Sequence, residues 1–153
     1  MIAAYCRKVN VFFNKYNINN IMILDKGSKF AHMSVGEIKG FEGKQFVKDS
    51  IGSTSCEISF GTLPSGAAVP FFHSHKENEE HYVILSGEGM FQIDDEVFKI
   101  REGSVIRVAT DCDRNLKCTS EDPMCYICIQ AKEGSLGGFT MTDAEVTERE
   151  NRL

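Results

Sequence analysis

The sequence predicts an all-β fold in the form of a sandwich or barrel. Two observations support this prediction. Short segments rich in β-branched and aromatic residues recur along the chain, and turn-forming residues separate them at close, regular spacing. Many short strands in succession favour a sandwich or barrel over alternating βαβ units. The predicted strands are residues 55–63, 81–87, 89–94, 97–100, 104–109 and 124–131.

The turns between these strands contain glycine, proline, serine and acidic residues, which favour chain reversal. Strands and turns together predict an all-β region over about residues 20–132. The turns are Pro64-Ser65-Gly66, Ser86-Gly87-Glu88-Gly89, Asp94-Asp95-Glu96, Glu102-Gly103 and Glu121-Asp122-Pro123.

The two ends of the chain have a different character. Residues 1–20 mix apolar residues with Asn-rich turns, so we expect them to add an edge strand or to pack on a neighbouring subunit. After Gly137-Gly138, Thr142 is a candidate N-cap with Glu145 three residues later. This pattern predicts a short charged helix or a frayed tail.

Composition limits the function. The 153 residues fit one domain, which buries roughly two thirds of its unfolded surface. The net charge is -5, and the lysines and arginines are scattered rather than clustered. Because phosphate binding depends on clustered positive charge, we expect no nucleic acid partner.

Neither a membrane segment nor a secretory core is predicted. Apolar runs stay well below the ~20 residues that span a bilayer, and Arg7, Lys8 and Lys15 interrupt the first apolar segment. We therefore expect a cytoplasmic protein with reduced thiols at its six cysteines. Cys125 and Cys128 lie in a predicted strand, where their side chains face opposite ways, so buried thiols are favoured over zinc binding.

A cluster of candidate metal ligands begins at "HSHKENEEHYVILSGEG", residues 73–89. On an extended strand His73 and His75 project from one face, with Ser74 between them pointing away. After a polar reversal Glu80 starts the next strand, sharing its face with Tyr82. Two imidazoles and one carboxylate form a set that holds Fe(II), Mn(II), Ni(II) or Zn(II) and leaves positions open for water or substrate.

The segment "GAAVPFFHSHKENEEHYVILSG" resembles the first conserved motif of the cupin superfamily. In that motif a glycine precedes HxH, a glutamate follows three or four residues later, and a glycine follows after six more. The matching positions are Gly66, His73, His75, Glu80 and Gly87, with one extra residue between Gly66 and His73.

The resemblance implies a double-stranded β-helix, or jelly-roll barrel, over residues 50–132. Residues 1–49 would then be an N-terminal extension with edge strands, and residues 133–153 a tail or short helix. The six residues before Gly87 select Glu80 over Glu77 and Glu79 as the ligand. His81 should face outward beside it.

The second cupin motif departs from the family pattern. In "GSVIRVATDCDRNLKC" Arg114 stands where the family has its fourth metal-binding histidine, and Cys118 where it has an asparagine. A guanidinium stays protonated and has no free lone pair, so Arg114 cannot replace the histidine as a ligand.

Three orientations of Arg114 remain open. Pointing into the barrel, it would form a bidentate ion pair with Glu80 and oppose metal binding. Alternatively, it would hold the carboxylate or phosphate of a substrate beside a metal bound by the three ligands. In the third case it points to solvent.

Other residues are candidates for contact with a small-molecule ligand. Tyr82 lies on the face of Glu80, and Gln92 could orient a substrate. Phe71 and Phe72 flank the mouth of the barrel, and we choose Phe72 as the one that lines the pocket. The candidate substrate-binding residues are therefore Arg114, Tyr82, Phe72 and Gln92.

The strand "HYVIL" is apolar on both faces, so another element must cover Val83 and Leu85 on its outer side. A second sheet, the N-terminal segment or a partner subunit would serve. Cupins of this size commonly dimerise, so the resemblance also favours a homodimer.

Three functions fit the sequence. The first is a metal-dependent enzyme of oxygenase or isomerase type acting on a small anionic molecule. The second is a ligand-binding or sensing cupin without catalysis. The third is a metal-free barrel with His73 or His75 as general base. We favour the first, with the binding protein as the alternative, since the fold hosts many chemistries.

Overall fold

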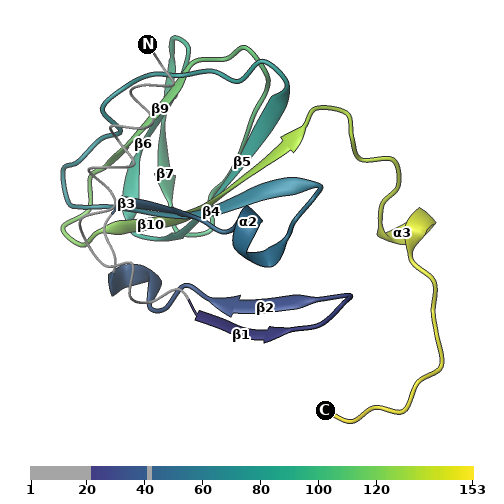
Figure 1. Cartoon of the computed structure of the whole chain (residues 1–153). Coiled ribbons are helices and arrows are strands. Elements are labelled where there is room, and N and C mark those ends of the chain that lie inside the picture. The colour runs from purple at the N-terminus through teal and green to yellow at the C-terminus, as the bar shows by residue number, and fades with distance from the viewer. Residues whose placement is uncertain (1–21, 41–42) are drawn as a thin grey trace.

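The computed structural model describes residues 22–40 and 43–153 (Figure 1). The predicted all-β barrel is confirmed, and each of the six predicted strands is present. The elements are β1 (Met22–Lys26), β2 (Ala31–Ser34), η2 (Ile38–Gly40), β3 (Gly43–Phe46), α2 (Lys48–Ile51), β4 (Cys56–Leu63), β5 (Asn78–Ser86), β6 (Glu88–Ile93), β7 (Glu96–Arg101), β8 (Val105–Val108), β9 (Arg114–Cys118), β10 (Met124–Lys132) and α3 (Thr140–Asp143).

Two sheets form the barrel. The larger has five strands in the order β3-β4-β10-β5-β8, and the smaller has three in the order β7-β6-β9. The strand pairs within both sheets are antiparallel. β10 inserts between β4 and β5, so the last strand of the barrel joins segments far apart in sequence. The hairpin of β1 and β2 forms a separate two-stranded sheet (Figure 1).

The core lies between the two sheets. Tyr82 on β5 contacts Phe91 on β6 edge to face, with ring centroids 5.1 Å apart, and Tyr126 on β10 at 5.9 Å. Ile84 and Leu116 are buried in the same cluster. Burying an aromatic side chain of this size contributes about 1.5–3 kcal/mol, so these contacts hold the sheets together.

β9 was not among the predicted strands, yet it supplies a site residue. Arg114, Leu116 and Cys118 are buried, while Asn115 is half-buried and Lys117 is exposed. The alternation is that of a strand with one buried face. Three of its five residues are polar or charged, so β9 lacks the run of β-branched and aromatic residues by which six of the other strands were predicted.

Five of the six cysteines lie in the described residues. Cys56, Cys112, Cys118, Cys125 and Cys128 are free, and the last three are buried. Cys125 is paired opposite Thr62 on β4, and Cys128 is paired opposite Tyr82 on β5. The two cysteines are three positions apart along β10, so their thiols lie on opposite faces of the strand. No helix in the described residues is long and apolar enough to cross a membrane.

The N-cap predicted at Thr142 is wrong. α3 begins at Thr140, and Thr142 lies within it, where its hydroxyl accepts a hydrogen bond from the Phe139 amide at 3.2 Å. Thr142 therefore reaches back to the helix start from inside the first turn. The edge strand or subunit contact expected of residues 1–20 lies outside the described residues.

The glycine that ends the first motif gives a test of the fold. Gly87 and Gly103 have φ values of 83° and 81°, where an L side chain is strained. A Cβ at Gly87 would also lie 2.8 Å from the Met124 Cα, whereas one at Gly103 would meet nothing within 4 Å. We predict that Gly103→Ala costs about 1 kcal/mol of unfolding free energy and Gly87→Ala about 2–3 kcal/mol.

Urea unfolding of both variants and the parent measures this difference. The comparison isolates the backbone contact, because the two positions share the same φ. Equal losses in the two variants would contradict the role of Met124.

Candidate functional site

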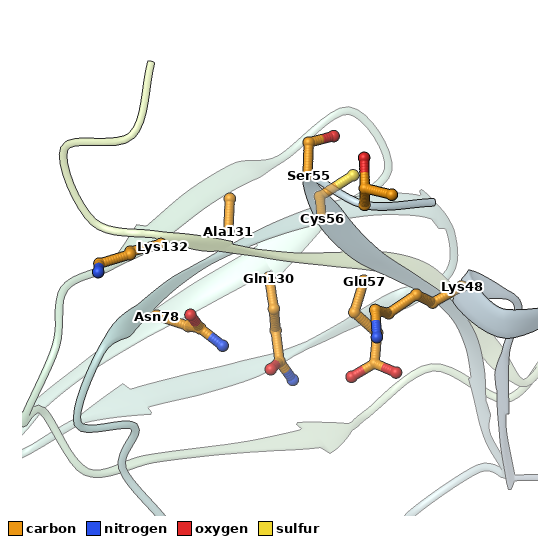
Figure 2. A pocket seen from close by; sticks show the side chains of 9 residues that line it. Lys48, Ser55, Cys56, Glu57, Asn78, Gln130, Ala131 and Lys132 are labelled. Atoms are coloured by element: carbon orange, nitrogen blue, oxygen red, sulfur yellow. The ribbon is translucent and has the colours of Figure 1, made fainter. Parts of the chain in front are cut away.

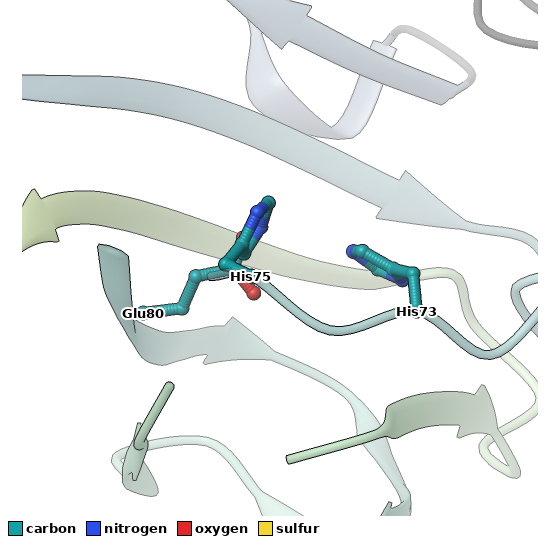
Figure 3. Close-up of side chains that lie close together, drawn as sticks. All are labelled: His73, His75 and Glu80. Atoms are coloured by element: carbon teal, nitrogen blue, oxygen red, sulfur yellow. The ribbon is translucent and has the colours of Figure 1, made fainter. Parts of the chain in front are cut away.

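The three predicted metal ligands converge at one end of the barrel. His73 and His75 lie on the segment before β5, and Glu80 lies in β5. One ligating atom from each residue lies within 4.8 Å of those of the other two. Figure 3 shows the His75 ring beside the Glu80 side chain, with His73 further along the same segment. The strand alternation inferred from sequence therefore brings these side chains together.

Glu80 is the centre of the site. It is 1% exposed, and both carboxylate oxygens accept hydrogen bonds. Tyr82 Oη donates to Oε2 at 2.6 Å, and Gln130 Nε2 donates to Oε1 at 2.8 Å. His75 Nε2 lies 3.1 Å from Oε1, and the Cys128 thiol donates to Oε1 at 3.4 Å. A buried carboxylate needs such partners to stay ionised.

Arg114 points into the barrel and pairs with Glu80. It is also 1% exposed. Nε donates a hydrogen bond to Glu80 Oε2 at 2.9 Å. Nη2 lies 2.6 Å from the same oxygen and forms an ion pair with it, but its N–H bonds point in directions that do not make a hydrogen bond. Nη1 donates to the His73 carbonyl at 2.8 Å. The orientation toward solvent is excluded, and the pair engages one carboxylate oxygen instead of both.

The two oxygens of Glu80 therefore have different surroundings. Oε2 faces Tyr82 and Arg114 in the interior. Oε1 faces His75 at the mouth, together with Gln130. Arg114 thus occupies one oxygen and leaves the other on the side of the histidines. A metal would therefore bind at Oε1, which also accepts hydrogen bonds from Gln130 and Cys128.

The protonation states follow from burial and neighbours. Burial alone would raise the pKa of Glu80, but hydrogen bonds from His75 and Tyr82, with the charges of Lys44 and Arg114, outweigh it and hold the pKa well below its ordinary value. Burial raises the pKa of Tyr82 well above its usual range, so Tyr82 remains a donor. Glu80 is an anion fixed by neutral and positive partners.

His73 is a neutral imidazole. Burial, then the positive charge of Arg114, lowers its pKa from 6.5 to about 4. Its ring contacts those of Phe71 and His75 edge to face, at 5.4 and 5.5 Å. Nδ1 is buried and has no hydrogen-bond partner in the described part of the chain. Metals bind the neutral ring, and an unpartnered buried nitrogen is costly unless something else binds it.

These observations test whether the residues fit a metal. Two ligand atoms about 2.1 Å from one ion lie about 3.0–3.4 Å from each other at octahedral or tetrahedral angles. The 3.1 Å between His75 Nε2 and Glu80 Oε1 falls in this range. His75 and Glu80 are therefore spaced to hold one divalent ion, the ligand atoms of all three residues lie within 4.8 Å of one another, and Arg114 supplies no fourth ligand.

One predicted substrate-binding residue faces away from the site. Gln92 is paired opposite Asn115, one position from the Ile93–Arg114 pair, so it faces away from Arg114. Its amide donates to the Asp94 carbonyl at 2.7 Å. The interior location expected of Gln92 is therefore corrected. Phe91 and Ile93 are the apolar neighbours of Gln92 in the sequence, so strand alternation already indicated that the Gln92 side chain faces outward.

Phe72 is 50% exposed, and its predicted contact with a ligand stays a prediction. Phe71 contacts the His73 ring, as expected for residues two apart on an extended segment. Tyr82 lies in the interior as predicted and donates to Glu80. Arg114 also lies there, where Nε and Nη1 donate to protein atoms, whereas Nη2 lies 2.6 Å from Glu80 Oε2 without making a hydrogen bond.

Glu79 and His81 face outward as predicted. Arg107 Nε lies 2.5 Å from a Glu79 carboxylate oxygen, and His81 Nε2 lies 3.8 Å from the other. Arg107 also contacts Glu133. This surface network separates Glu79 from the site, as the choice of Glu80 required.

Sequence reasoning missed three residues of the site. Gln130 and Cys128, both on β10, bond to Glu80. Burial raises the pKa of the Cys128 thiol to about 11, so it remains a donor. Lys44 on β3 places positive charge near Glu80 and His73. No local signal marks them, because both faces of β10 are largely apolar and β3 is short.

A polar cavity of about 280 Å³ adjoins the site through Gln130. Figure 2 shows Lys48, Glu57, Asn78 and Gln130 on one side of β10. Glu57, Gln130 and Glu80 are paired across three neighbouring strands, so their side chains share the inner face of the sheet. The cavity thus lies at the end of the barrel where Glu80 is found.

The fold and site define a double-stranded β-helix protein with an HxH and glutamate cluster at one end. The model of the family described as "Cupin domain" matches residues 59–130. The chain belongs to the cupin family, and the resemblance found in the sequence is confirmed.

Known relatives agree with this assignment. The chain is similar to the crystal structure of a cupin protein from Bacteroides fragilis, with 42% identity, a TM-score of 0.73, and coverage of 80% of this chain and 100% of that one. An uncharacterized protein from Methanocaldococcus jannaschii is 24% identical over 67% of this chain and 71% of its own. A cupin 2 conserved barrel domain protein from Salinispora arenicola shares the fold alone, at 13% identity and TM-score 0.52, covering 59% of this chain and 75% of that one.

The neutral state of His73 predicts a pH dependence of stability. Because its pKa falls from 6.5 to about 4 on folding, the unfolded chain binds a proton that the folded chain does not bind between these values. Stability should therefore fall as the pH falls from about 6.5 toward 4. His73→Phe should flatten this decline. Urea midpoints of both proteins from pH 4 to 8 measure it, and parallel profiles would contradict the prediction.

Proposed function

We propose that this cupin barrel binds a divalent metal ion through His73, His75 and Glu80 and binds a small anionic molecule beside it. The observation that carries the proposal is the division of the Glu80 carboxylate. Tyr82 and Arg114 hold Oε2, whereas Oε1 lies 3.1 Å from His75 Nε2. Metal-bound carboxylates are commonly held in this way by hydrogen bonds from behind.

Each residue has a defined part in this proposal. His73 would supply a neutral ring nitrogen, His75 would supply Nε2 in place of its contact with Glu80, and Glu80 would supply Oε1, a set that suits Fe, Mn, Ni or Zn. Such an ion would supply Lewis acidity and open positions, the chemistry of oxygenase or isomerase reactions. Arg114 fixes Glu80 and also binds the His73 carbonyl, so it orients two of the three ligands.

The positive charge of Arg114 sets the strength of the site. It offsets the charge of Glu80, so the unliganded site is close to neutral and attracts a cation less than a histidine-containing cupin site would. We therefore expect metal affinity below that of a four-ligand site.

Metal binding is measured by titrating chelator-treated protein with Zn(II) in a calorimeter. We predict one equivalent bound, and we predict that His75→Ala and Glu80→Gln each weaken binding by about 100-fold, the scale of about 2.7 kcal/mol. His81→Ala is the matched control, because this adjacent histidine faces Glu79 outside the site. Equal affinity in all four proteins would place the ion elsewhere.

A metal-free binding protein is the second candidate function. The buried pair of Arg114 and Glu80 favours it, because the guanidinium already compensates the carboxylate charge. Absence of Zn(II), Fe(II), Mn(II) and Ni(II) binding by the folded parent protein would support this candidate and exclude the metal site.

We also propose that the protein is a cytoplasmic homodimer. The free thiols of the described cysteines support the compartment. The outer face of the larger sheet supports the dimer. There Phe60, Ile127, Val83 and Val105 are neighbours in one row across four strands. Val105 is 70% exposed at the end of this row. A contiguous apolar row of this kind is typical of an interface.

Val105→Glu tests the dimer. The charge should convert a dimer of about twice 17.1 kDa into a monomer without unfolding it, since the side chain is exposed. Val97→Glu is the control, because Val97 is exposed on β7 of the other sheet. Sedimentation measures both, and a parent monomer would refute the dimer.

A further inference from the structure

One positive charge on the inner face of the barrel remains outside the Glu80 network. Lys44 lies in β3, paired opposite Gly61, which is paired in turn with Tyr126. Tyr126 belongs to the buried core, so this row of side chains faces the interior. Lys44 is half-buried at the edge of the larger sheet.

The Lys44 side chain runs along β3 toward the site. Its Nζ lies 5.3 Å from the centroid of the Phe46 ring. Phe46 is paired opposite Ser59, in the row of Cys128 and Tyr82, and the next row contains Gln130 and Glu80.

Lys44 differs from Arg114 and Lys48 in its partners, and from the exposed lysines in its place on the inner face of the sheet. Arg114 donates to Glu80 and to the His73 carbonyl. Lys48 lies 3.8 Å from Asp49. None of the ion pairs among the described residues includes Lys44. The Phe46 ring is the one partner that these contacts give to its ammonium group.

Phe46 gives the surroundings of Lys44 a second property. It is 47% exposed although it lies on the inner face. An ammonium over a half-exposed ring presents a charge beside an apolar surface. An organic acid with a flat apolar body matches both, because its carboxylate pairs with the cation while its body packs on the ring.

We propose that Lys44 is the residue that recognises the anionic group of the ligand, and that the ligand is a small carboxylate with a planar apolar body lying against Phe46. This assignment rests on the anion binding in the proposed function and moves the anion-binding role from Arg114 to Lys44. Arg114 is then a positioning residue for Glu80 and His73.

Benzoate and its neutral analogue benzamide test the assignment in chelator-treated protein without metal. The expected result is benzoate binding with shifts of the Lys44, Phe46 and His73 resonances in NMR spectra, and much weaker benzamide binding. Lys44→Met should weaken benzoate binding by about 10- to 100-fold, the scale of one charge-assisted contact, and leave benzamide unchanged. Lys99→Met, at an exposed lysine on β7 of the other sheet, should have no effect.

Lys44→Arg keeps the charge and should retain most of the affinity, and circular dichroism verifies that each variant is folded. Benzoate binding that Lys44→Met leaves unchanged, or no benzoate binding by the folded parent, would overturn the assignment. Because no metal is present, neither result depends on whether Zn(II) binds to His73, His75 and Glu80. A failed metal titration would leave this test intact.

Discussion

The buried ion pair between Glu80 and Arg114 is the interaction on which the site depends. It joins β5 of the larger sheet to β9 of the smaller one, and both side chains are 1% exposed. Removing one partner of such a pair leaves an uncompensated buried charge, at a cost of about 3–5 kcal/mol. The pair therefore couples the closure of the barrel to the orientation of the carboxylate. A variant without this pair would lose both the orientation of the Glu80 carboxylate and part of the stability of the barrel.

The same arginine also holds the segment that carries the histidines. The Arg114 amide and Nη1 both donate to the His73 carbonyl, at 3.1 and 2.8 Å, and the Asp111 amide donates to that of His75 at 2.9 Å. These bonds attach an irregular segment to the start of β9. The residue that departs from the cupin motif thus has a structural role in this chain. Its charge opposes a cation, but its geometry preserves the arrangement of the three remaining ligands.

Cupin membership explains the barrel but leaves the chemistry to individual side chains. Glu80, Tyr82 and Arg114 form a rigid interior group, whereas His73 and His75 lie nearer the mouth and are only half-buried. Lys44 stands apart on the edge strand, where its charge is not consumed by a carboxylate. The site therefore separates the group that orients a metal ligand from the group that would recognise an anion.

Alternation and short spacing were enough to predict six of the strands, the convergence of His73, His75 and Glu80, and the inward direction of Tyr82. The same alternation indicates that Phe71, two residues before His73, lies beside it rather than Phe72. Tertiary structure alone decided that Arg114 pairs with Glu80 and that Gln130, Cys128 and Lys44 join the site. The hydrogen bonds to Glu80 link β5, β9 and β10, while β3 adds the charge of Lys44. Strand pairing between distant segments is set by the packing of the whole core, which local sequence does not encode.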